Sequence, residues 1–495
     1  MKTMKNMSST MLCLLAVLLM ASGCSESDST ADNESAEDTA ALTIETESRE
    51  TARADIKDGL PEDIDLQGQK VSFIIVPECA AYDILGESGG DIIFDAVYNR
   101  NLRVEERLNV DIDCIEHGIG YEHDAMAQTI RKAVMSSSNE FSAVMQRGMQ
   151  AFNLSLQGMY MNLNENDYID LTKPWWNDSI SDFSINTEKV YTLMGDITMS
   201  PFLFSTACFV NKEMMKDYSL DIDELYETVQ NGSWTYDVFR KYCAAAYSDI
   251  DGDGKASEND HFGFAWTNNA AYFTRSAGIY YISRDNDGYP TLALNNEKTG
   301  GFLEKLNSIL HDDTLAYHSP KKDITEVASY FITGKNLFFM GRLMWVTGIY
   351  SDNFRNMQDP YGIIPYPKYS EEDEYMSGTG ASSGNLVAVP ITCTNYEETS
   401  IVIEAMCAES YRSVFPAFYE IALKSKYADA NIDSQMIDLI HERVYNDFTI
   451  VANLDILIDN LVRQNKNDFS SAYASNETKM QKALDKMIND YIDAE

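Results

Sequence analysis

The sequence predicts an α/β fold, in which strands and helices alternate along the chain. Residues 71–76 (VSFIIV) form a continuous apolar run of strand length, and residues 110–115 (VDIDCI) alternate apolar and polar side chains. Between them, the apolar residues of 91–108 recur near one face of a helix. A second helical segment, 121–135, leads into the short apolar run FSAVM at 141–145. Strands that alternate with helices indicate a largely parallel sheet.

The same kind of pattern returns in the second half of the chain. After Thr206, the segment ACFVNKEMM indicates the start of another lobe. From Ser434 to the end, the pattern is mostly helical, and in the last segment apolar residues recur every three or four positions. Hydrophobic residues make up 44% of the chain, which is enough for large cores, and its length predicts two or more domains.

The N-terminus predicts export. Lys2 and Lys5 precede the apolar run MLCLLAVLLM, which is too short to span a membrane, and small residues then lead to Cys24. The end of this segment resembles a bacterial lipobox, although Ala21 stands where the family pattern usually has leucine. The resemblance implies that residues 1–23 are a signal peptide and that a lipid on Cys24 anchors the mature protein to the cell membrane, outside the cytoplasm. The alternative is an ordinary signal with an incidental cysteine.

Residues 24–65 are predicted to form a disordered acidic tether. Between 25 and 60 the chain consists largely of Ser, Thr, Asp, Glu and Ala, with few large apolar side chains. Such a segment cannot bury enough apolar surface to offset its chain entropy.

The charge balance excludes two classes of partner. The chain carries 38 Lys and Arg residues against 78 Asp and Glu residues, a net charge of −40. A field of that sign repels nucleic acid and anionic lipid. The cysteines beyond Cys24 are scattered without metal-ligand spacing, so most are expected to be buried small side chains, although an exported chain can oxidise some of them.

The segment DIDGDGKASEND, residues 249–260, has the spacing of a calcium-binding loop. Carboxylates fall at loop positions one, three, five and twelve, and Gly254 at position six allows a sharp turn. The predicted ligands are Asp249, Asp251, Asp253, Asp260 and the carbonyl oxygen of Lys255. Position twelve is Asp and not the longer Glu, and the alternative is a solvated acidic turn. Because the strand-like run HFGFAW follows, we expect a structural Ca²⁺ and not a helix–loop–helix sensor.

Phrases spread from about residue 70 to the end form an ordered set. They are DLTKPWWNDSI (170–180), VYTLMGDITMS (190–200), FVNKEMMKDYSL (209–220), NGSWTYDVF (231–239), the calcium-loop segment (249–266), YGIIPYPKY (361–369) and EAMCAESYRSVFPAFYEIALKSKYAD (404–429). The set resembles the extracellular solute-binding lipoproteins of ABC importers, in the family 1-like, carbohydrate-binding group. That resemblance implies a two-lobe, periplasmic-binding-protein-like fold that holds its ligand in a cleft between the lobes.

The family architecture, carried over, gives a map of the chain. Lobe 1 would comprise residues 66–205 and 386–425, and lobe 2 residues 206–385 and 426–495. The chain would cross between the lobes near 200–208, near 384–390 and near Ala428. Several crossings at one waist make a hinge, and closure of the lobes around a ligand is a recognised switching mode. Closure follows ligand binding only if the ligand binds the closed form better.

Four residues are predicted to contact the ligand. A sugar presents C–H faces, which flat aromatic rings meet, and hydroxyl edges, which fixed polar groups meet. In the PWW turn, Trp175 and Trp176 are adjacent large rings, so one of them is expected to reach a surface or the cleft. The resemblance places Trp345 in a cleft-lining segment of lobe 2. Arg147 follows the FSAVM strand, where the carboxyl ends of parallel strands open toward a crevice. The alternative for each tryptophan is the core, and for Arg147 the solvated surface.

We therefore expect a non-enzymatic, monomeric ligand-capturing subunit that serves the membrane subunits of an ABC transporter, with a sugar or oligosaccharide as ligand. Two alternatives remain open. One is a surface glycoside hydrolase whose paired carboxylates are hidden by the acidic composition. The other is a lipoprotein that binds ligand for a sensor kinase. The GASSG sequence at 380–384 matches a nucleophile elbow, but a loop precedes it and a strand follows, so we interpret it as a Gly/Ser-rich hinge.

Overall fold

The computed structural model describes most of the chain from residue 53 onward. The described residues are 53–177, 183–186, 188–267, 270–319, 323–347, 354, 357–379, 384–423, 430–445, 448–449, 454 and 456–493. Residues 46–495 belong to one structural unit. The predicted signal peptide, Cys24 and the GASSG hinge residues 380–383 lie outside the described residues.

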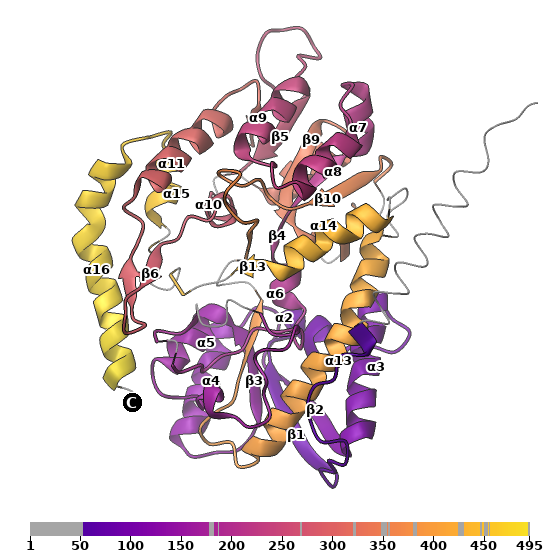
Figure 1. Cartoon of the computed structure of the whole chain (residues 1–495), viewed down its shortest axis with the longest axis vertical. Helices are drawn as coiled ribbons and strands as arrows, with labels where there is room; N and C mark the ends of the chain where they lie inside the picture. Colours follow the sequence, from indigo (N-terminus) through magenta and orange to yellow (C-terminus); the bar gives the residue numbers. More distant parts are fainter. Residues whose placement is uncertain are drawn as a thin grey trace, which may run out of the picture. The chain divides into compact units, whose positions relative to one another are not determined.

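The first sheet has four strands in the order β12-β3-β1-β2 (Figure 1). They are β1 (Gln69–Ile75), β2 (Val110–Glu116), β3 (Ala143–Arg147) and β12 (Asn385–Ala388). Strand β1 runs parallel to both β2 and β3, whereas β12 is antiparallel to β3. The three parallel strands are the three predicted in the first part of the chain, and the prediction of an α/β fold is confirmed there.

Two long helices cover the first sheet together. Helix α3 (Ile92–Leu108) begins at Asp91, whose side chain accepts a hydrogen bond from the backbone N–H of Ile93. It buries one face, as predicted, and α13 (Tyr396–Leu423) packs along it (Figure 1). Helices α4 (His123–Met135) and α5 (Gly148–Ser155) pack against each other and follow β2 and β3 in the chain. Helix α3 carries the chain from the carboxyl end of β1 to the start of β2, and α4 carries it from β2 to β3.

The second sheet has five strands in the order β10-β4-β9-β5-β8. They are β4 (Thr206–Asn211), β5 (Phe262–Trp266), β8 (Ala316–His318), β9 (Asn336–Arg342) and β10 (Tyr361–Ile364). Strand β5 is parallel to β8 and β9, but β4 is antiparallel to both β9 and β10. The prediction of a largely parallel sheet is therefore wrong for this region, because the strand that precedes β4 in the chain is β3 of the first sheet, so no crossover helix joins β4 to an earlier strand of its own sheet.

The remaining elements surround these sheets. Those between the two sheets' strands in sequence are α2 (Pro77–Ala80), the π-helix η1 (Ala81–Leu85), η2 (Leu163–Glu165), α6 (Ser200–Leu203), α7 (Lys212–Asp217), α8 (Ile222–Gln230), α9 (Tyr236–Ala245), α10 (Ala271–Ser276), α11 (Glu297–Leu310), α12 (Ile324–Ile332) and η4 (Leu343–Thr347). The C-terminal helices are α14 (Ala430–Glu442), α15 (Ile456–Arg463) and α16 (Phe469–Asp493). Two short pairs complete the set: β6 (Ile282–Arg284) with β7 (Pro290–Leu292), and β11 (Ser377–Gly378) with β13 (Val444–Tyr445).

Two segments carry the described chain between the sheets. Residues 190–199 run beside β12, with Leu193 bridged to Val387, and α6 then leads into β4 of the second sheet. The chain returns between β11 and β12. The third predicted crossing, near Ala428, lies outside the described residues. The exact lobe boundaries and the closing motion stay predictions.

The predicted tether is too long. From Arg53 onward the chain packs on α3 and α13, and Asp58 is only 5% exposed. Asp58 accepts a hydrogen bond of 3.0 Å from Arg107 and also pairs with Arg412. Leu60 is buried as well. The prediction rested on the average composition of residues 25–60. That average does not show that a few residues near the end of the segment have partners elsewhere in the chain.

Candidate functional site

The carboxyl ends of the parallel strands mark the candidate site. In the first sheet, β1, β2 and β3 all end at one edge, where Glu78, the 117–122 loop and Arg147 lie. In the second sheet, β5 and β9 end at Trp266 and Arg342. Ligands of open α/β sheets bind outside the carboxyl ends of the strands. The side chains at these two edges are therefore the ones to compare with the predicted site.

A charged cluster stands at the edge of the first sheet. The guanidinium of Arg147 donates to Glu78 Oε1 at 2.6 Å, and His123 Nε2 lies 2.8 Å from Glu78 Oε2. The side chain of Arg147 is 21% exposed, that of Glu78 is 8% exposed and that of His123 is 5% exposed. Burial alone raises the pKa of Glu78, but the hydrogen bonds and charges of His123 and Arg147 outweigh it and lower that pKa. Arg147 is thus a fixed member of an ion-paired cluster and not a solvated surface residue.

Two buried nitrogen atoms of this cluster are available for further hydrogen bonds. Within the described residues, Arg147 Nε and His123 Nδ1 are buried without a hydrogen-bond partner. Buried polar atoms are nearly always paired, by protein or by water, so each unpaired atom calls for an explanation. A polar group that binds at this edge would supply one.

Tyr121 extends the same edge, and the sequence reasoning missed it. Its ring is 65% exposed, and the guanidinium carbon of Arg147 lies 5.8 Å from the ring centroid. The loop that carries it turns at Gly118 and Gly120, both with positive φ, a conformation that glycine adopts without steric cost. The GIGY sequence after an alternating strand was the available signal for a loop of this kind.

The edge of the second sheet is aromatic. A cavity of about 240 Å³ there is lined mainly by aromatic and apolar side chains. Its walls include Trp266, Tyr272, Arg342, Trp345 and Tyr366. The guanidinium of Arg342 lies 4.6 Å from the ring centroid of Tyr272 and 5.6 Å from that of Phe204. Cation–π stacking of this kind holds a charged group in place beside an apolar surface.

Trp345 lies at this cavity but is also part of the core. Only 3% of it is exposed, and its ring contacts Phe339 edge-on at 5.2 Å and Phe354 at 5.6 Å. One side of the indole therefore packs inward while the residue lines the cavity wall. Its predicted contact with a ligand stays a prediction.

A second cavity joins the two edges. Its volume is about 270 Å³, and its lining residues come from the first sheet's edge and the crossing segment, with Met344 alone from the second sheet's side. Glu78 and Tyr121 contribute from the first sheet, Ser200 and Phe204 from the crossing segment, and Met344 from η4. Larger cavities lie elsewhere, one of about 680 Å³ between α15 and α16 and one of about 420 Å³ beside α14. Among these cavities, the one of about 270 Å³ has lining residues from both sides.

Of the two positions expected for one of the adjacent tryptophans, a surface or the cleft, the surface is wrong. Trp175 and Trp176 are 1% and 5% exposed, so neither ring reaches the surface. Their indole N–H groups donate to the two oxygens of one buried carboxylate, Glu404, at 3.1 and 3.0 Å. Gly195 lets the second ring in, because a Cβ there would stand 2.5 Å from Trp176. Burial raises the pKa of Glu404 to about 8.

Both rings border the 420 Å³ cavity beside α14, away from the strand ends. That position separates them from Trp345 and Arg147. A contact between these two rings and a ligand stays a prediction. The signal that sequence reasoning lacked was the partner, Glu404, which lies more than 200 positions further along the chain.

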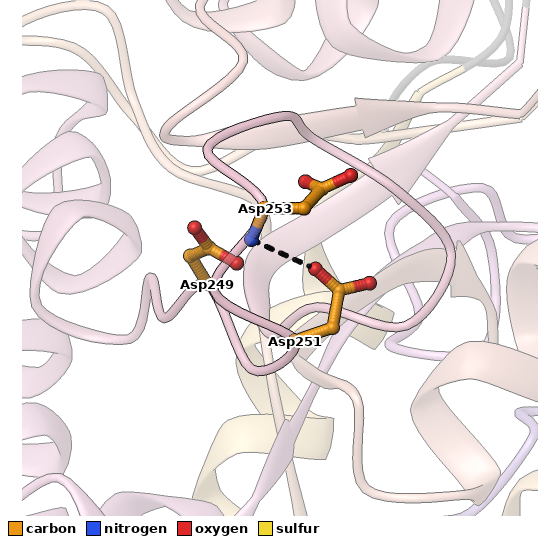
Figure 2. Close-up of side chains that lie close together, drawn as sticks. All are labelled: Asp249, Asp251 and Asp253. Atoms are coloured by element: carbon orange, nitrogen blue, oxygen red, sulfur yellow. Dashed lines mark hydrogen bonds between the residues drawn. The ribbon is translucent and has the colours of Figure 1, made fainter.

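Three of the predicted calcium ligands come together (Figure 2). One carboxylate oxygen from each of Asp249, Asp251 and Asp253 lies within 4.8 Å of the others. Asp260 is not in this group. Its oxygens accept from the backbone N–H groups of Ile250 and Ser257, at 3.0 and 2.8 Å, and it is 1% exposed. All four carboxylates accept backbone N–H groups of the loop, but only the first three also gather where a cation could lie between them.

In the described part of the chain, no helix is long and apolar enough to cross a membrane.

The comparisons with known proteins identify the fold. No protein-family model matches the sequence, and no curated protein matches it. Solved structures do. M. tuberculosis UspC matches with a TM-score of 0.55 at 14% identity, over 84% of this chain and 100% of that chain. The GacH receptor of Streptomyces glaucescens matches with a TM-score of 0.52 at 10% identity, over 86% and 99%.

M. tuberculosis UgpB matches with a TM-score of 0.51 at 16% identity, over 85% of this chain and 99% of that chain. At these identities the likeness concerns the fold alone. The chain has the α/β fold of the periplasmic-binding-protein-like, solute-binding proteins over most of its length, and the predicted fold class is confirmed.

Proposed function

We propose that this protein captures a carbohydrate, a sugar or an oligosaccharide, as the substrate-binding subunit of an ABC transporter. The observation that carries the proposal is the cavity between the strand ends, which takes polar groups from one sheet and stands beside an aromatic cavity of the other. The fold supports it. GacH is described in complex with acarbose, and the Xanthomonas citri protein MalE, with a TM-score of 0.52, is described as sugar-binding.

The two edges divide the work of recognition. A sugar ring has apolar C–H faces, which Tyr272 and its aromatic neighbours would cover, and hydroxyls, which need fixed donors and acceptors. The Glu78–Arg147 pair provides both, because a carboxylate accepts and a guanidinium donates. Ligand held by both edges would favour a closed arrangement of the two sheets, since only that arrangement makes both sets of contacts.

A thermal-shift screen tests the ligand class. We would screen maltose, maltotriose, raffinose, xylobiose and acarbose, with glycerophosphocholine as a non-saccharide, because UgpB is described in complex with that molecule. A saccharide present at about 100 times its Kd stabilises the native state by about 2.7 kcal/mol. A shift with a saccharide is expected. A shift with glycerophosphocholine alone, or with none of these compounds, would contradict the carbohydrate assignment.

Two further measurements separate the alternatives. Incubation of the protein with the bound oligosaccharide should release no reducing sugar; steady release would identify a glycoside hydrolase. Deletion of the gene should abolish uptake of the labelled saccharide. If uptake continues and only the transcriptional response to the sugar disappears, the protein serves a sensor kinase.

We propose the lipid anchor on Cys24, and with it an extracytoplasmic location, from the sequence of the N-terminus. A Cys24→Ala variant should be released from the membrane into the medium or periplasm. The wild-type protein should stay with the membrane fraction after washing with salt, and should incorporate labelled fatty acid. If the Cys24→Ala variant stays on the membrane, the proposal of a lipid anchor at Cys24 is contradicted.

We also propose a structural Ca²⁺ in the 249–260 loop. It is supported by the three gathered carboxylates and by their spacing, and the cation would relieve their mutual repulsion. A chelator should lower the melting temperature and added Ca²⁺ should restore it. Asp251→Ala combined with Asp253→Ala should remove this dependence without changing saccharide affinity, because the loop lies at the start of β5, the opposite end of that strand from the cavity. A chelator without effect would favour the solvated turn.

A further inference from the structure

Asp83 is a buried carboxylate at the point where the chain passes between the sheets. It lies in the π-helix η1, two elements after β1, and none of its surface is exposed. Single π-helical turns are rare and are often found at functional sites. Asp83 has no role in the proposed function described above.

Three donors from the two passing segments meet this carboxylate. On the outgoing segment, the backbone N–H and the hydroxyl of Ser200 donate to Asp83 at 2.9 and 2.7 Å. On the returning segment, the amide of Asn385 donates to Asp83 Oδ2 at 2.8 Å. The backbone N–H of Asn385 also donates to the hydroxyl of Ser200 at 2.8 Å. One side chain therefore joins the outgoing segment to the first residue of β12, the strand by which the returning segment enters the first sheet.

The two segments lie in direct contact at this point. A Cβ on Gly384 would stand 2.6 Å from the Cα of Pro201, so the returning chain passes tightly against α6. The hydroxyl of Thr198 donates to the carbonyl oxygen of Asn385 at 2.9 Å. Residues 198–201 and 384–385 thus form one block with Asp83.

Arg100 fixes the same block from the other side. This buried guanidinium of α3 donates to the backbone oxygens of Asp83 and Ile197, at 2.8 and 3.0 Å, and to the hydroxyl of Ser410 in α13. With both segments fixed at Ser200 and Asn385, any movement of the second sheet must turn about residues beyond them. Ser200 also lines the cavity between the sheets, together with Phe204 and Met344.

We propose that the Asp83 carboxylate is a positioning residue of the candidate cleft, which clamps both passing segments to the first sheet, and that its protonation releases the clamp. The consequence for ligand binding rests on the proposed function; the clamp itself does not. A carboxylate accepts at both oxygens, whereas a carboxylic acid presents a donor at one of them. With three donors facing it, the protonated side chain cannot accept all three hydrogen bonds, so at least one of them must break or, at the Ser200 hydroxyl, reverse its direction.

The Asp83 carboxyl group changes its protonation state near pH 6. Burial raises the pKa of Asp83 to about 6, although Ser200, Asn385 and Arg100 act in the opposite direction. A folded-state pKa above the ordinary aspartate value of 3.8 means that the folded protein takes up the proton as the pH falls through about 6. Asp83 is then ionised at pH 7.5 and largely protonated at pH 5, so the hydrogen bonds to a charged carboxylate are present at the first pH and lost at the second.

The other charged groups around Asp83 do not titrate with it. Arg100 stays protonated, since its pKa is lowered only to about 10. The thiol of Cys79 on α2 is neutral, because burial raises its pKa well above the usual value. On the far side of Arg100, burial likewise raises the pKa of the Cys407 thiol of α13 and keeps it neutral, and Glu409 contributes a further negative charge there.

Hydrogen exchange measures the clamp without any ligand. Peptides that cover 197–205 and 384–389 report the N–H groups of Ser200 and Asn385. After correction for intrinsic exchange rates, their protection in the wild-type protein should fall about tenfold or more between pH 7.5 and pH 5, the size expected for loss of hydrogen bonds to a charged group. In Asp83→Asn, which cannot ionise, protection should be low at both values of pH.

Two variants serve as controls. Asp58→Asn removes another buried carboxylate, far from these segments in sequence and paired with Arg107, and should keep the wild-type pH response. His123→Gln removes the histidine at the edge of the first sheet, which bonds Glu78 and not Asp83, and should keep it too. If Asp83→Asn does not fold, Ser200→Ala tests the same clamp, and its pH response should be clearly smaller than that of the wild type.

Wild-type protection that does not change with pH would overturn the proposal, and so would a full pH response in Ser200→Ala. Because these measurements need no saccharide, they stand even if the ligand screen fails. Conversely, saccharide binding together with an unresponsive clamp would leave the proposed function in place and remove the role of Asp83.

Discussion

The two edges of the candidate cleft are built in opposite ways. The edge of the first sheet is polar. Glu78 orients both Arg147 and His123 through hydrogen bonds, so the position of each side chain depends on the others. The edge of the second sheet is aromatic, and its charged side chain Arg342 is stacked between two rings. Polar groups need precise partners to be fixed, whereas rings are fixed by packing. A change at the first edge should therefore disturb binding through misorientation, and one at the second edge through lost surface.

Trp345→Ala should have the largest effect, and mainly on stability. The indole packs against Phe339 and Phe354 in the core, so its removal leaves a cavity and should cost about 3–5 kcal/mol of unfolding free energy. Chemical denaturation measures this. Trp234→Ala, a buried tryptophan on the same sheet's core and not at the cavity, is the matched control.

At a temperature where both variants are folded, calorimetry separates the roles. If Trp345 contacts the saccharide, its variant loses affinity and Trp234→Ala does not. Equal affinity in both variants would place Trp345 in the core alone.

Glu78→Gln should have the next largest effect. It leaves the Arg147 guanidinium and His123 without their shared acceptor charge, at a cost of about 2 kcal/mol, reduced from the value for a fully buried pair because Arg147 is partly exposed. Equilibrium unfolding at pH 7 measures it.

The pH dependence of this effect follows from the direction of the pKa shift. The folded-state pKa of Glu78 is lowered, so its contribution to stability is present above the ordinary glutamate value of 4.5 and is lost as the pH falls through the lower, folded value. Wild type and Glu78→Gln should therefore converge in stability as the pH falls below the folded-state pKa of Glu78, which lies under 4.5. A difference that persists unchanged at low pH would show that packing, and not charge, accounts for the effect.

Arg342→Lys should act more weakly. Lysine keeps the charge but not the planar group that stacks on Tyr272 and Phe204, so the loss should be about 1 kcal/mol. The same substitution at Arg147 is the comparison, because it would break a hydrogen-bonded pair instead of a stack. If saccharide affinity falls more for Arg147→Lys than for Arg342→Lys, the polar edge determines orientation; the reverse result would contradict the division of roles.

Tyr121→Ala should have the smallest effect on stability, less than about 0.5 kcal/mol, since the ring is 65% exposed. Its affinity for the saccharide should nevertheless fall about fivefold, a loss typical of an exposed aromatic contact that a ligand covers. Ile119→Ala, on the same loop and 81% exposed, should leave the affinity unchanged. Equal losses in both variants would point to loop order and not to a ring contact.

The parts of the fold that follow from local pattern were predictable. The strand run at 71–76 and the periodic helix at 91–108 lie where expected, because burial of one face or of a whole strand leaves its period in the sequence. The direction of β4 could not be predicted in this way. The direction of a strand depends on where the chain enters the sheet, and not on the residues of the strand.

The site divides in the same way. Arg147 could be placed at a strand end from sequence, but its partners Glu78 and His123 come from two other segments, and only folding shows that the three meet. Adjacent tryptophans suggested one exposed ring, because sequence cannot show a distant carboxylate that satisfies both indoles. The calcium loop lies between these cases: its spacing gathers three carboxylates locally, while the role of Asp260 depended on the turn that the backbone adopted.

By itself, the sequence determined the alternation of strands and helices and the acidic character of the chain, because each of these is a local or summed property of residue types. Tertiary structure decided which side chains share a site. The distances between Glu78, Arg147 and His123, and the three donors that converge on Asp83, join residues separated by tens to hundreds of positions. Such contacts carry no local period, and they arise only when packing of the strands and helices fixes the backbone that presents them.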